Sequence, residues 1–388
     1  MKLLKPYYYD KFKCIGSACP NTCCKGWDIS IDEEMNKLYQ DLEGDFGDRL
    51  RQNIYSKNNQ NYFKLNQSKV CPFLNENMLC EIYINLGEES MCDTCKNYPR
   101  ITKLHADIIE QTLTLSCPEV ARLLIESKTK IDFEYGEIKR LKLKPEKVNA
   151  SLFNCMLHAR TLFIDIMQKK HIKLLYRQLL LIIISDKIQK YLNNKMYDEV
   201  EKLIERYYDD KYINLYIEQL HHMQINDSKE LKYNFISEYI QNVFKYTINE
   251  DTYIMKLYKK FFVDDSHMTF DKVLHKYEES FDKYYEQNSH VYENFYVHTI
   301  FRYCFDALED GQIFKHIILT NLGYLIIHVF DVLSWVDNNE VLTDANQSLI
   351  FGAFSFAFEH NINNFNNMYK FLETNNLNTL AFQALLLN

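Results

Sequence analysis

The sequence predicts a mainly α-helical protein in which an N-terminal, cysteine-rich, metal-binding module of short helices and loops precedes a multi-helix C-terminal body. Three observations support this fold class. The chain has only nine glycines and six prolines in 388 residues, fewer than the tight turns of a sheet-rich fold usually require. Nine of its eleven cysteines lie within the first 117 residues. Beyond residue 148, apolar residues recur at the spacing of amphipathic helices.

The expected module covers residues 1–126, where turn-rich stretches separate the cysteines. A short helix is expected to begin near Ser30 or Asp32, because Ser30 and Glu33 have the spacing of a capping box. Residues 56–69 are rich in Asn and Lys and are expected to form a loop.

A second helix is expected to begin at Cys117. Cys117 would be its cap, Pro118 its first helical residue and Glu119 an acid in its first turn. Residues 127–147 are charged and poor in apolar runs, so we place the domain boundary there.

The expected body covers residues 148–388. Its first amphipathic stripe consists of Met156, Phe163, Met167, Leu174, Leu181, Ile188 and Leu192. Further helices are expected over residues 196–224, 229–246, 250–262, 270–286, 290–309, 312–335, 343–360 and 364–386. Leu349–Phe358 is apolar on nearly all sides, which indicates a central helix.

Composition argues against several classes of protein. The net charge is −8 and no block of Lys and Arg stands out, so nucleic acid is not an expected partner. The first residues lack the apolar segment of a signal peptide. The apolar runs Leu179–Ile184 and Ile317–Phe330 are shorter or more interrupted than a membrane span of about 20 residues. We therefore expect a cytoplasmic protein without a membrane span; the sequence does not indicate its oligomeric state.

The clustered cysteines are typical of metal ligands, because a reducing cytosol disfavours disulfides. They are Cys14, Cys19, Cys23, Cys24, Cys71, Cys80, Cys92, Cys95 and Cys117. Thiolates select zinc or iron–sulfur clusters. Three of these cysteines precede proline, as in the ligand run of bacterial ferredoxins, which favours an iron–sulfur cluster, of the 4Fe–4S type, over zinc. Only Cys92 and Cys95 have the C-x2-C spacing common at zinc sites.

Two details of the cysteine pattern leave alternatives open. Cys23 and Cys24 are adjacent, so either one of them binds while the other packs, or the two serve different ions. Cys155 and Cys304 stand alone on helical stripes and are expected to be buried small side chains.

Several motifs in residues 8–122 are distinctive. They are Tyr8-x3-Phe12-x-Cys14, Cys19-x3-Cys23-Cys24-x-Gly26-Trp27, Cys71-Pro72-Phe73-Leu74, Cys95-x2-Tyr98-Pro99-Arg100 and Ser116-Cys117-Pro118-Glu119. Together they resemble the bacterial flagellin lysine-N-methylase family, and Glu293-Asn294-Phe295 resembles a segment of it in the body. The cysteine part is also similar to a broader class of zinc- or iron-chelating domains.

The resemblance implies N-methylation of lysine side chains on flagellin, with S-adenosylmethionine as the methyl donor. The metal ligands that it implies are Cys14, Cys19, Cys23, Cys24, Cys71, Cys80, Cys95 and Cys117. Cys92 is the least favoured ligand among the nine clustered cysteines. The sequence has no G-x-G loop and no C-x3-C-x2-C run, since Gly26 follows Cys19 and Cys23 at the third position. We therefore expect S-adenosylmethionine to bind at an unfamiliar kind of site, such as an incompletely ligated iron of the cluster.

Methyl transfer to lysine requires a neutral amine, whereas a free lysine has a pKa of about 10.4. A carboxylate base would help, and Asp28 and Glu293 are the catalytic candidates. Trp27, Arg100 and Arg122 are the candidates for binding the cofactor. The alternatives are solvated carboxylates, a tryptophan that anchors a small core, and arginines in surface ion pairs.

The expected function is therefore a flagellin lysine N-methyltransferase that depends on a cysteine-ligated metal or iron–sulfur centre. The alternative is a non-catalytic metal-binding or redox-sensing protein that docks a partner through its helical body, or a metal-chelating assembly factor.

Overall fold

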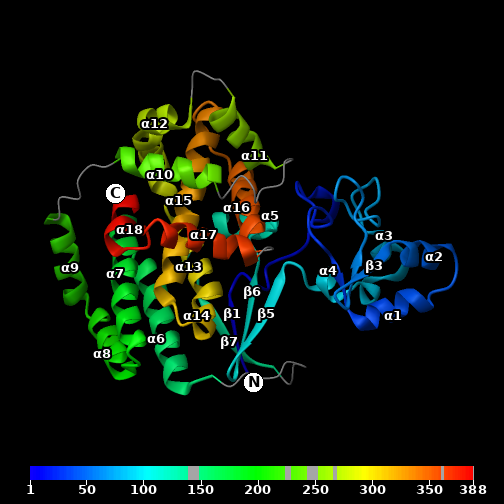
Figure 1. Cartoon of the computed structure of the whole chain (residues 1–388), viewed down its shortest axis with the longest axis horizontal. Helices are drawn as coiled ribbons and strands as arrows, with labels where there is room; N and C mark the ends of the chain where they lie inside the picture. The colour runs from blue at the N-terminus through cyan, green and yellow to red at the C-terminus, as the bar shows by residue number, and fades with distance from the viewer. Residues whose placement is uncertain (139–147, 223–228, 243–251, 265–268, 360–361, 388) are drawn as a thin grey trace.

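The computed structural model describes residues 1–138, 148–222, 229–242, 252–264, 269–359 and 362–387. It confirms a mainly helical protein. Figure 1 shows a small lobe on one side, a helical body on the other and a sheet between them. The expectation of only short helices and loops in residues 1–126 is wrong, because six strands lie among them.

The small lobe combines a three-stranded sheet with four short helices. The sheet has the strand order β2-β4-β3 and is antiparallel throughout. The elements are β2 (Ser30–Ile31), α1 (Glu33–Asp41), α2 (Asp45–Gln52), β3 (Ile54–Lys57), β4 (Gln60–Phe63), α3 (Glu81–Leu86) and α4 (Asp93–Asn97).

Two local sequence features explain how this lobe differs from expectation. Helix α1 begins after Asp32, whose Oδ1 accepts a hydrogen bond from the Met35 backbone N–H at 2.9 Å. Ser30 lies in β2, so the predicted capping box is wrong. Residues 56–69 contain part of the β3–β4 hairpin, because Asn58 and Asn59 adopt positive φ angles of 52° and 60°, as a two-residue hairpin turn requires.

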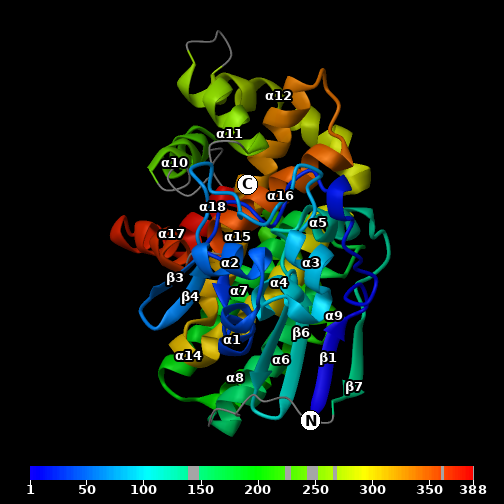
Figure 2. The same cartoon turned by 90° about the vertical axis from the view of Figure 1, so that its right-hand side faces the viewer.

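A four-stranded sheet joins the N-terminus to later parts of the chain. Strand β1 pairs in parallel with β6, with Leu3 opposite Ile109, and antiparallel with β7, with Leu4 opposite Tyr135. Figure 2 shows these strands side by side. The sheet has the order β5-β6-β1-β7, formed by β1 (Lys2–Pro6), β5 (Arg100–His105), β6 (Ile108–Leu113) and β7 (Phe133–Glu137). Strand β7 thus lies in the charged stretch expected to be a boundary.

The helical body begins with α5 (Pro118–Glu126), whose N-cap is Cys117 and whose first residue is Pro118, as predicted. The other helices are α6 (Ala150–Met167), α7 (Leu174–Asn193), α8 (Tyr197–Tyr207), α9 (Asp210–His222), α10 (Lys229–Asn242), α11 (Tyr253–Tyr258), α12 (Phe270–Tyr285), α13 (His290–Tyr303), α14 (Ala307–Asp310), α15 (Ile313–Asp337), α16 (Asp344–Glu359), α17 (Ile362–Thr374) and α18 (Leu380–Leu387). A π-helical turn, Lys259–Val263, extends α11.

Helix α15 is the centre of the body and contacts α7, α12, α13 and α16. It is long and apolar enough to cross a membrane by length and composition, but 94% of its most apolar window is buried inside the protein. The core helix of a globular protein has the same properties. Leu349–Phe358 lies in α16, which packs between α5 and α15, so its predicted central position is confirmed.

The buried side chains form two separate cores. The larger core includes Leu4, Tyr8, Phe12 and Leu113 together with the body helices. The smaller core is built around Phe73 and contains residues between Cys24 and Cys95. We call residues 24–95, which contain the smaller core, the small module. Strand β1 and the segment around α5 belong to the larger core, so they pack with the helical body.

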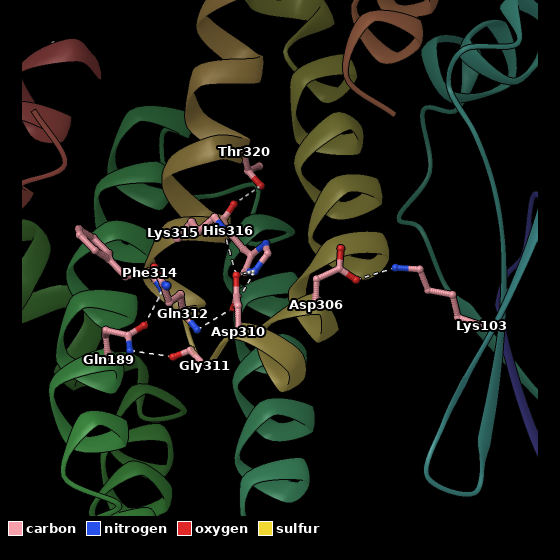
Figure 3. Close-up of polar contacts among 10 residues, drawn as sticks. All are labelled: Lys103, Gln189, Asp306, Asp310, Gly311, Gln312, Phe314, Lys315, His316 and Thr320. Carbon is pink, nitrogen blue, oxygen red and sulfur yellow. Dashed lines mark hydrogen bonds and ion pairs between the residues drawn. The ribbon is translucent and has the colours of Figure 1, made fainter. Parts of the chain in front are cut away.

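Polar contacts join the four-stranded sheet to the body. Figure 3 shows Lys103 of β5 reaching Asp306, with 2.6 Å between Nζ and Oδ1. At the end of α14, Asp310 accepts hydrogen bonds from Lys315 Nζ and His316 Nε2, both at 3.1 Å. These contacts fix the corner from which α15 begins.

Candidate active site

The segment between β1 and β2 carries four of the expected metal ligands, namely Cys14, Cys19, Cys23 and Cys24. Gly16 and Gly26 in this segment have φ angles of 55° and 91°, which glycine adopts without strain. The Gly26 N–H donates to the Lys69 carbonyl at 2.9 Å, and the Cys71 N–H donates to the Cys24 carbonyl at 2.8 Å. The end of the segment is thereby fixed against the small module.

Five cysteines pack in the smaller core and form what we name the core group: Cys24, Cys71, Cys80, Cys92 and Cys95. Cys92 is the N-cap residue of α4, and Cys95 lies in the first turn of this helix. A hydrogen bond between their thiols lowers the pKa of Cys92 and raises that of Cys95. Burial raises the pKa of Cys71 to about 12, and the nearby sulfurs of Cys24 and Cys80 add to this effect.

The other four cysteines form what we name the loop group: Cys14, Cys19, Cys23 and Cys117. Cys117 is buried in the larger core at the start of α5. Burial raises its pKa to about 11, although the backbone N–H groups of Val120 and Glu119 oppose the shift by donating to its sulfur. The negative charges of Cys19 and Cys14 raise the pKa of Cys117 further.

The two groups meet at the adjacent residues Cys23 and Cys24. The Cys23 thiol donates a hydrogen bond to the Cys24 sulfur, which lowers the pKa of Cys24 to about 7 and raises that of Cys23. Cys14 and Cys117 act electrostatically on Cys23, whereas Cys24 acts on Cys71, Cys80 and Cys95.

The donor atoms have the chemistry of a soft-metal site. All eleven cysteines are free thiols, and thiolates are preferred ligands of zinc and iron–sulfur clusters. In the described part of the chain, however, no three His, Cys, Asp or Glu side chains are arranged as ligands of one metal ion. Metal binding by this module therefore stays a prediction, supported by donor type and by proximity within each group.

A cleft of about 370 Å³ lies beside the loop group. One wall comes from the cysteine segment and the small module, and the other comes from α11, α16 and the start of α5. The residues that line it are Pro20, Asn21, Thr22, Cys23, Lys25, Trp27, Met78, Tyr98, Ser116, Thr252, Tyr253, Lys256, Leu349, Ala353 and Phe356. The cleft thus combines aromatic rings, hydroxyl groups and two lysines in the volume range of small-ligand sites.

Trp27 is held in the cleft wall by two contacts. Its Nε1 donates to the Cys23 carbonyl at 2.7 Å, and its ring lies 5.7 Å from the Tyr98 ring, centroid to centroid. The Tyr98 hydroxyl in turn lies 3.1 Å from Ser116 Oγ. These contacts connect the cysteine segment, the small module and the residue before Cys117 across the cleft.

The remaining predicted site residues lie elsewhere. Asp28 is exposed and does not line the described cleft. Arg100 is exposed, with its guanidinium 5.0 Å from the centre of the Phe12 ring. Arg122 forms ion pairs with Glu119 and Glu126. Of the candidates for cofactor binding, the structure brings only Trp27 to the cleft.

Glu293 lies inside the helical body. Its Oε2 is 2.6 Å from Nη1 of Arg177, and both side chains are almost fully buried. Arg177 also donates to the Met167 carbonyl. The structure therefore separates Glu293 from the cleft and from Asp28, and it gives Glu293 a partner that holds α7 to α13.

The cleft also contains residues that the sequence analysis did not single out as functional. Tyr98 and Ser116 stand within recognised motifs, so those motifs were the signal that could have identified them. Tyr253 and Lys256 of α11 carry no sequence signal, because only the tertiary fold brings them opposite Trp27.

The amino-acid sequence is similar to that of known proteins, and a family model matches most of the helical body. Residues 160–386 match the family model of the FliB lysine N-methylase C-terminal domain. Over 127 residues, the chain is 30% identical to a lysine-N-methylase of Salmonella typhimurium, a match that covers 31% of this chain and 32% of that protein. A lysine-N-methylase of Salmonella choleraesuis matches to the same extent.

The flagellar biosynthetic protein FliU of Salmonella muenchen is also 30% identical over 127 residues, which cover 75% of its length. The match thus spans about a third of the two lysine-N-methylases and three quarters of FliU. No solved structure matches the chain significantly. Because the family model covers more than half of the sequence, the chain belongs to the FliB lysine N-methylase family.

Proposed function

We propose that the chain is a protein-lysine N-methyltransferase that acts on flagellin, uses S-adenosylmethionine and requires a cysteine-bound metal or iron–sulfur centre. The relatives' names, lysine-N-methylase and flagellar biosynthetic protein FliU, support this reaction and this class of substrate. The observation that carries the proposal is the cleft, because the cysteine segment and the body matched by the family model line it together.

The bound donor would supply a methyl group on a positively charged sulfur. The lone pair of a neutral lysine nitrogen would form the new N–C bond as the S–C bond breaks, so that the sulfur leaves as a neutral thioether and the methylated nitrogen takes the positive charge. The cleft favours that neutral form. Lys25 and Lys256 both line it, and nearby positive charges disfavour protonation of a third amine. The same two cations would attract the donor's carboxylate.

The aromatic residues of the cleft suit the positively charged sulfur of the donor. Trp27, Tyr98 and Tyr253 line the same cavity, and the faces of such rings attract a cation by about 0.5–2 kcal/mol. Leu349, Ala353 and Phe356 of α16 supply an apolar wall. This wall would exclude water from the reacting groups and strengthen the electrostatic effects of the lysines.

The test uses the full chain, purified without oxygen and supplied with flagellin and S-adenosylmethionine that carries a labelled methyl group. We expect labelled methyl-lysine on flagellin. Trp27→Ala should weaken donor binding about tenfold, consistent with a loss of 1–2 kcal/mol. Lys256→Ala should lower the methylation rate and raise the pH at which that rate is half-maximal, because the substrate amine would lose a neighbouring cation.

The matched control is Lys259→Ala. Lys259 is exposed in the π-helical turn after α11 and does not line the cleft. Equal effects of the two lysine substitutions would contradict the role of the cleft. Absence of methyl transfer by well-folded protein loaded with metal would contradict the proposed activity and favour the alternative, a metal-binding or redox-sensing protein that docks a partner.

A further inference from the structure

Five large apolar side chains are exposed on the small module and on the segment that leads into it. We name them the apolar patch: Ile15, Met78, Leu79, Tyr83 and Ile84, which are 39%, 43%, 40%, 53% and 56% exposed. Of the fifteen large apolar side chains exposed in the described part of the chain, four lie within residues 78–84. Single exposed apolar residues are ordinary, whereas a contiguous group of them marks an interaction surface.

The side chains of the apolar patch lie next to one another around the start of α3. Leu79 precedes the N-cap residue Cys80, and Ile84 is the fourth residue of the helical part. Apolar side chains at these two positions of a helix start often pack against each other. On the other side, a Cβ atom placed on Gly16 would lie 3.8 Å from Leu79 Cδ2, so the backbone beside Ile15 is close to Leu79. Leu79 is therefore the centre of the patch.

A tight turn presents Met78 and Leu79 to solvent. Asn75 Oδ1 accepts hydrogen bonds from the backbone N–H groups of Asn77 at 3.0 Å and of Leu79 at 2.9 Å. The Asn75 N–H donates to the Leu79 carbonyl at 2.9 Å, and the Met78 N–H donates to the Asn75 carbonyl at 3.0 Å. Met78 has a φ angle of 59°, which is unfavourable for a residue with a Cβ atom. The turn is thus fixed in a shape that leaves its apolar side chains uncovered.

The apolar patch continues into the cleft. Met78 belongs to the patch and also lines the cleft, together with Pro20, Asn21 and Trp27 of the cysteine segment. Since consecutive residues of a chain lie about 3.8 Å apart, a bound segment that leaves the cleft over Met78 reaches Leu79 within a few residues. A protein whose lysine enters the cleft can therefore cover the patch with neighbouring residues, whereas a free lysine cannot.

The module that carries most of the apolar patch is acidic. Residues 24–95 contain thirteen Asp and Glu against seven Lys and Arg, so they carry −6 of the chain's net charge of −8. Glu76 lies in the turn before Met78, and Glu88 follows α3; both are exposed. An acidic rim around an apolar centre favours a partner that offers basic together with apolar side chains. The same charge disfavours an anionic membrane surface and a second copy of this acidic chain.

We propose that the apolar patch docks the protein substrate, through a segment next to the target lysine that carries apolar side chains and further basic residues. This inference rests on the proposed function, and it names the surface that selects a protein over a free lysine. The segment would lie across Leu79, Tyr83 and Ile84, and the target lysine would enter the cleft past Met78.

The test measures the binding of purified monomeric flagellin to the full chain by calorimetry, without S-adenosylmethionine. Tyr83→Ser/Ile84→Ser removes the two most exposed side chains of the patch, and neither residue lines the cleft. Tyr208→Ser/Leu215→Ser is the matched control, because these side chains are 50% and 57% exposed on the helical body. Both double variants should unfold at the same urea concentration as the wild type.

We expect the patch variant to bind flagellin at least about tenfold more weakly, and the control variant to bind it like the wild type. In methylation assays the patch variant should show a similar rise in the KM for flagellin, with kcat and the affinity for S-adenosylmethionine unchanged, because the patch lies outside the cleft. Glu76→Gln/Glu88→Gln should weaken flagellin binding about threefold at low ionic strength and less at high ionic strength.

Three results would overturn the inference. They are unchanged flagellin affinity in the patch variant, equal losses in the patch and control variants, and a wild-type chain that binds no flagellin. Self-association of the wild type, or binding to vesicles of anionic phospholipid, that only the patch variant loses would assign the patch to a second copy or to a membrane instead.

Binding and methyl transfer are scored in separate assays. Weaker binding by the patch variant alone supports the docking surface even if no flagellin is methylated. Methylation with an unchanged KM for flagellin would leave the proposed activity intact and remove the docking surface.

Discussion

The ion pair between Glu110 and Arg160 joins strand β6 to helix α6 inside the protein. Arg160 Nη1 lies 2.8 Å from Glu110 Oε2, and Nη2 lies 2.5 Å from Oε1. The two side chains are 3% and 7% exposed. The guanidinium also lies 3.7 Å from the centre of the Phe305 ring. Removing the carboxylate would therefore leave a buried positive charge without its counter-charge.

We expect Glu110→Gln to lower the free energy of unfolding by about 3–5 kcal/mol, the usual cost of breaking a buried ion pair on one side. This is a large share of the roughly 5–15 kcal/mol by which folded proteins are stable. The double variant Glu110→Leu/Arg160→Met should recover most of the loss, since apolar residues of similar volume often replace a buried pair without cost.

The assay is urea unfolding followed by circular dichroism. The matched control is Glu199→Gln, which breaks an exposed pair with Lys202 and should cost less than about 0.5 kcal/mol. A cost below about 1 kcal/mol for Glu110→Gln would refute the reasoning. So would a double variant that is no more stable than the single one.

Two further predictions concern single carboxylates. Burial opposes the charge of Asp310, but hydrogen bonds from His316 and Lys315 outweigh it and lower the pKa of Asp310 to about 2. Its contribution to the free energy of unfolding, about 1 kcal/mol once solvent screening of this half-exposed group is allowed for, should be present at neutral pH and disappear as pH falls from about 4 to 2. Asp310→Asn should flatten acid unfolding in that window, and an unchanged profile would contradict this. Asp32 caps α1 and also accepts from the Asp93 N–H at 2.8 Å. Asp32→Ala should therefore cost about 1–2 kcal/mol in thermal unfolding, unlike Asp41→Ala at the other end of α1.

Much of the helical body could be predicted because its signals are local. The apolar stripe that includes Met156, Phe163 and Ile188 is buried as expected, because helical periodicity reports directly which face packs. Cys117-Pro118 marked a helix start correctly, since proline at the first helical position needs no backbone N–H.

The strands were missed because their signals are short or lie far apart in sequence. Strand β1 is only five residues long, and its partners β6 and β7 begin more than 100 residues later. No pattern within the first residues reveals such partners. The Asn58-Asn59 turn was a usable local signal, because asparagine tolerates positive φ.

In the candidate active site, too, local sequence signals identified some residues, whereas contacts between distant parts of the chain could not be predicted. Of the residues that the cysteine motifs singled out, Cys23 and Trp27 line the cleft, and metal binding by the cysteines stays a prediction. The interaction of Glu293 with Arg177, by contrast, joins residues of α7 and α13 that lie 116 positions apart in sequence. Sequence spacing carries no information about such a contact.

The central position of β1 in its sheet has a consequence for the order of folding during synthesis. Lys2–Pro6 leaves the ribosome before the small module, but its neighbours Ile108–Leu113 and Phe133–Glu137 emerge only after the whole of that module. Contacts of such long sequence separation form late, because the entropy of closing the loop is lost before they stabilise anything. Strand β1 therefore stays unpaired while eight of the nine clustered cysteines are synthesised, because only Cys117 follows β6 in the sequence. A nascent chain in this state is open to chaperones, to incorrect strand pairing and to premature capture of metal ions.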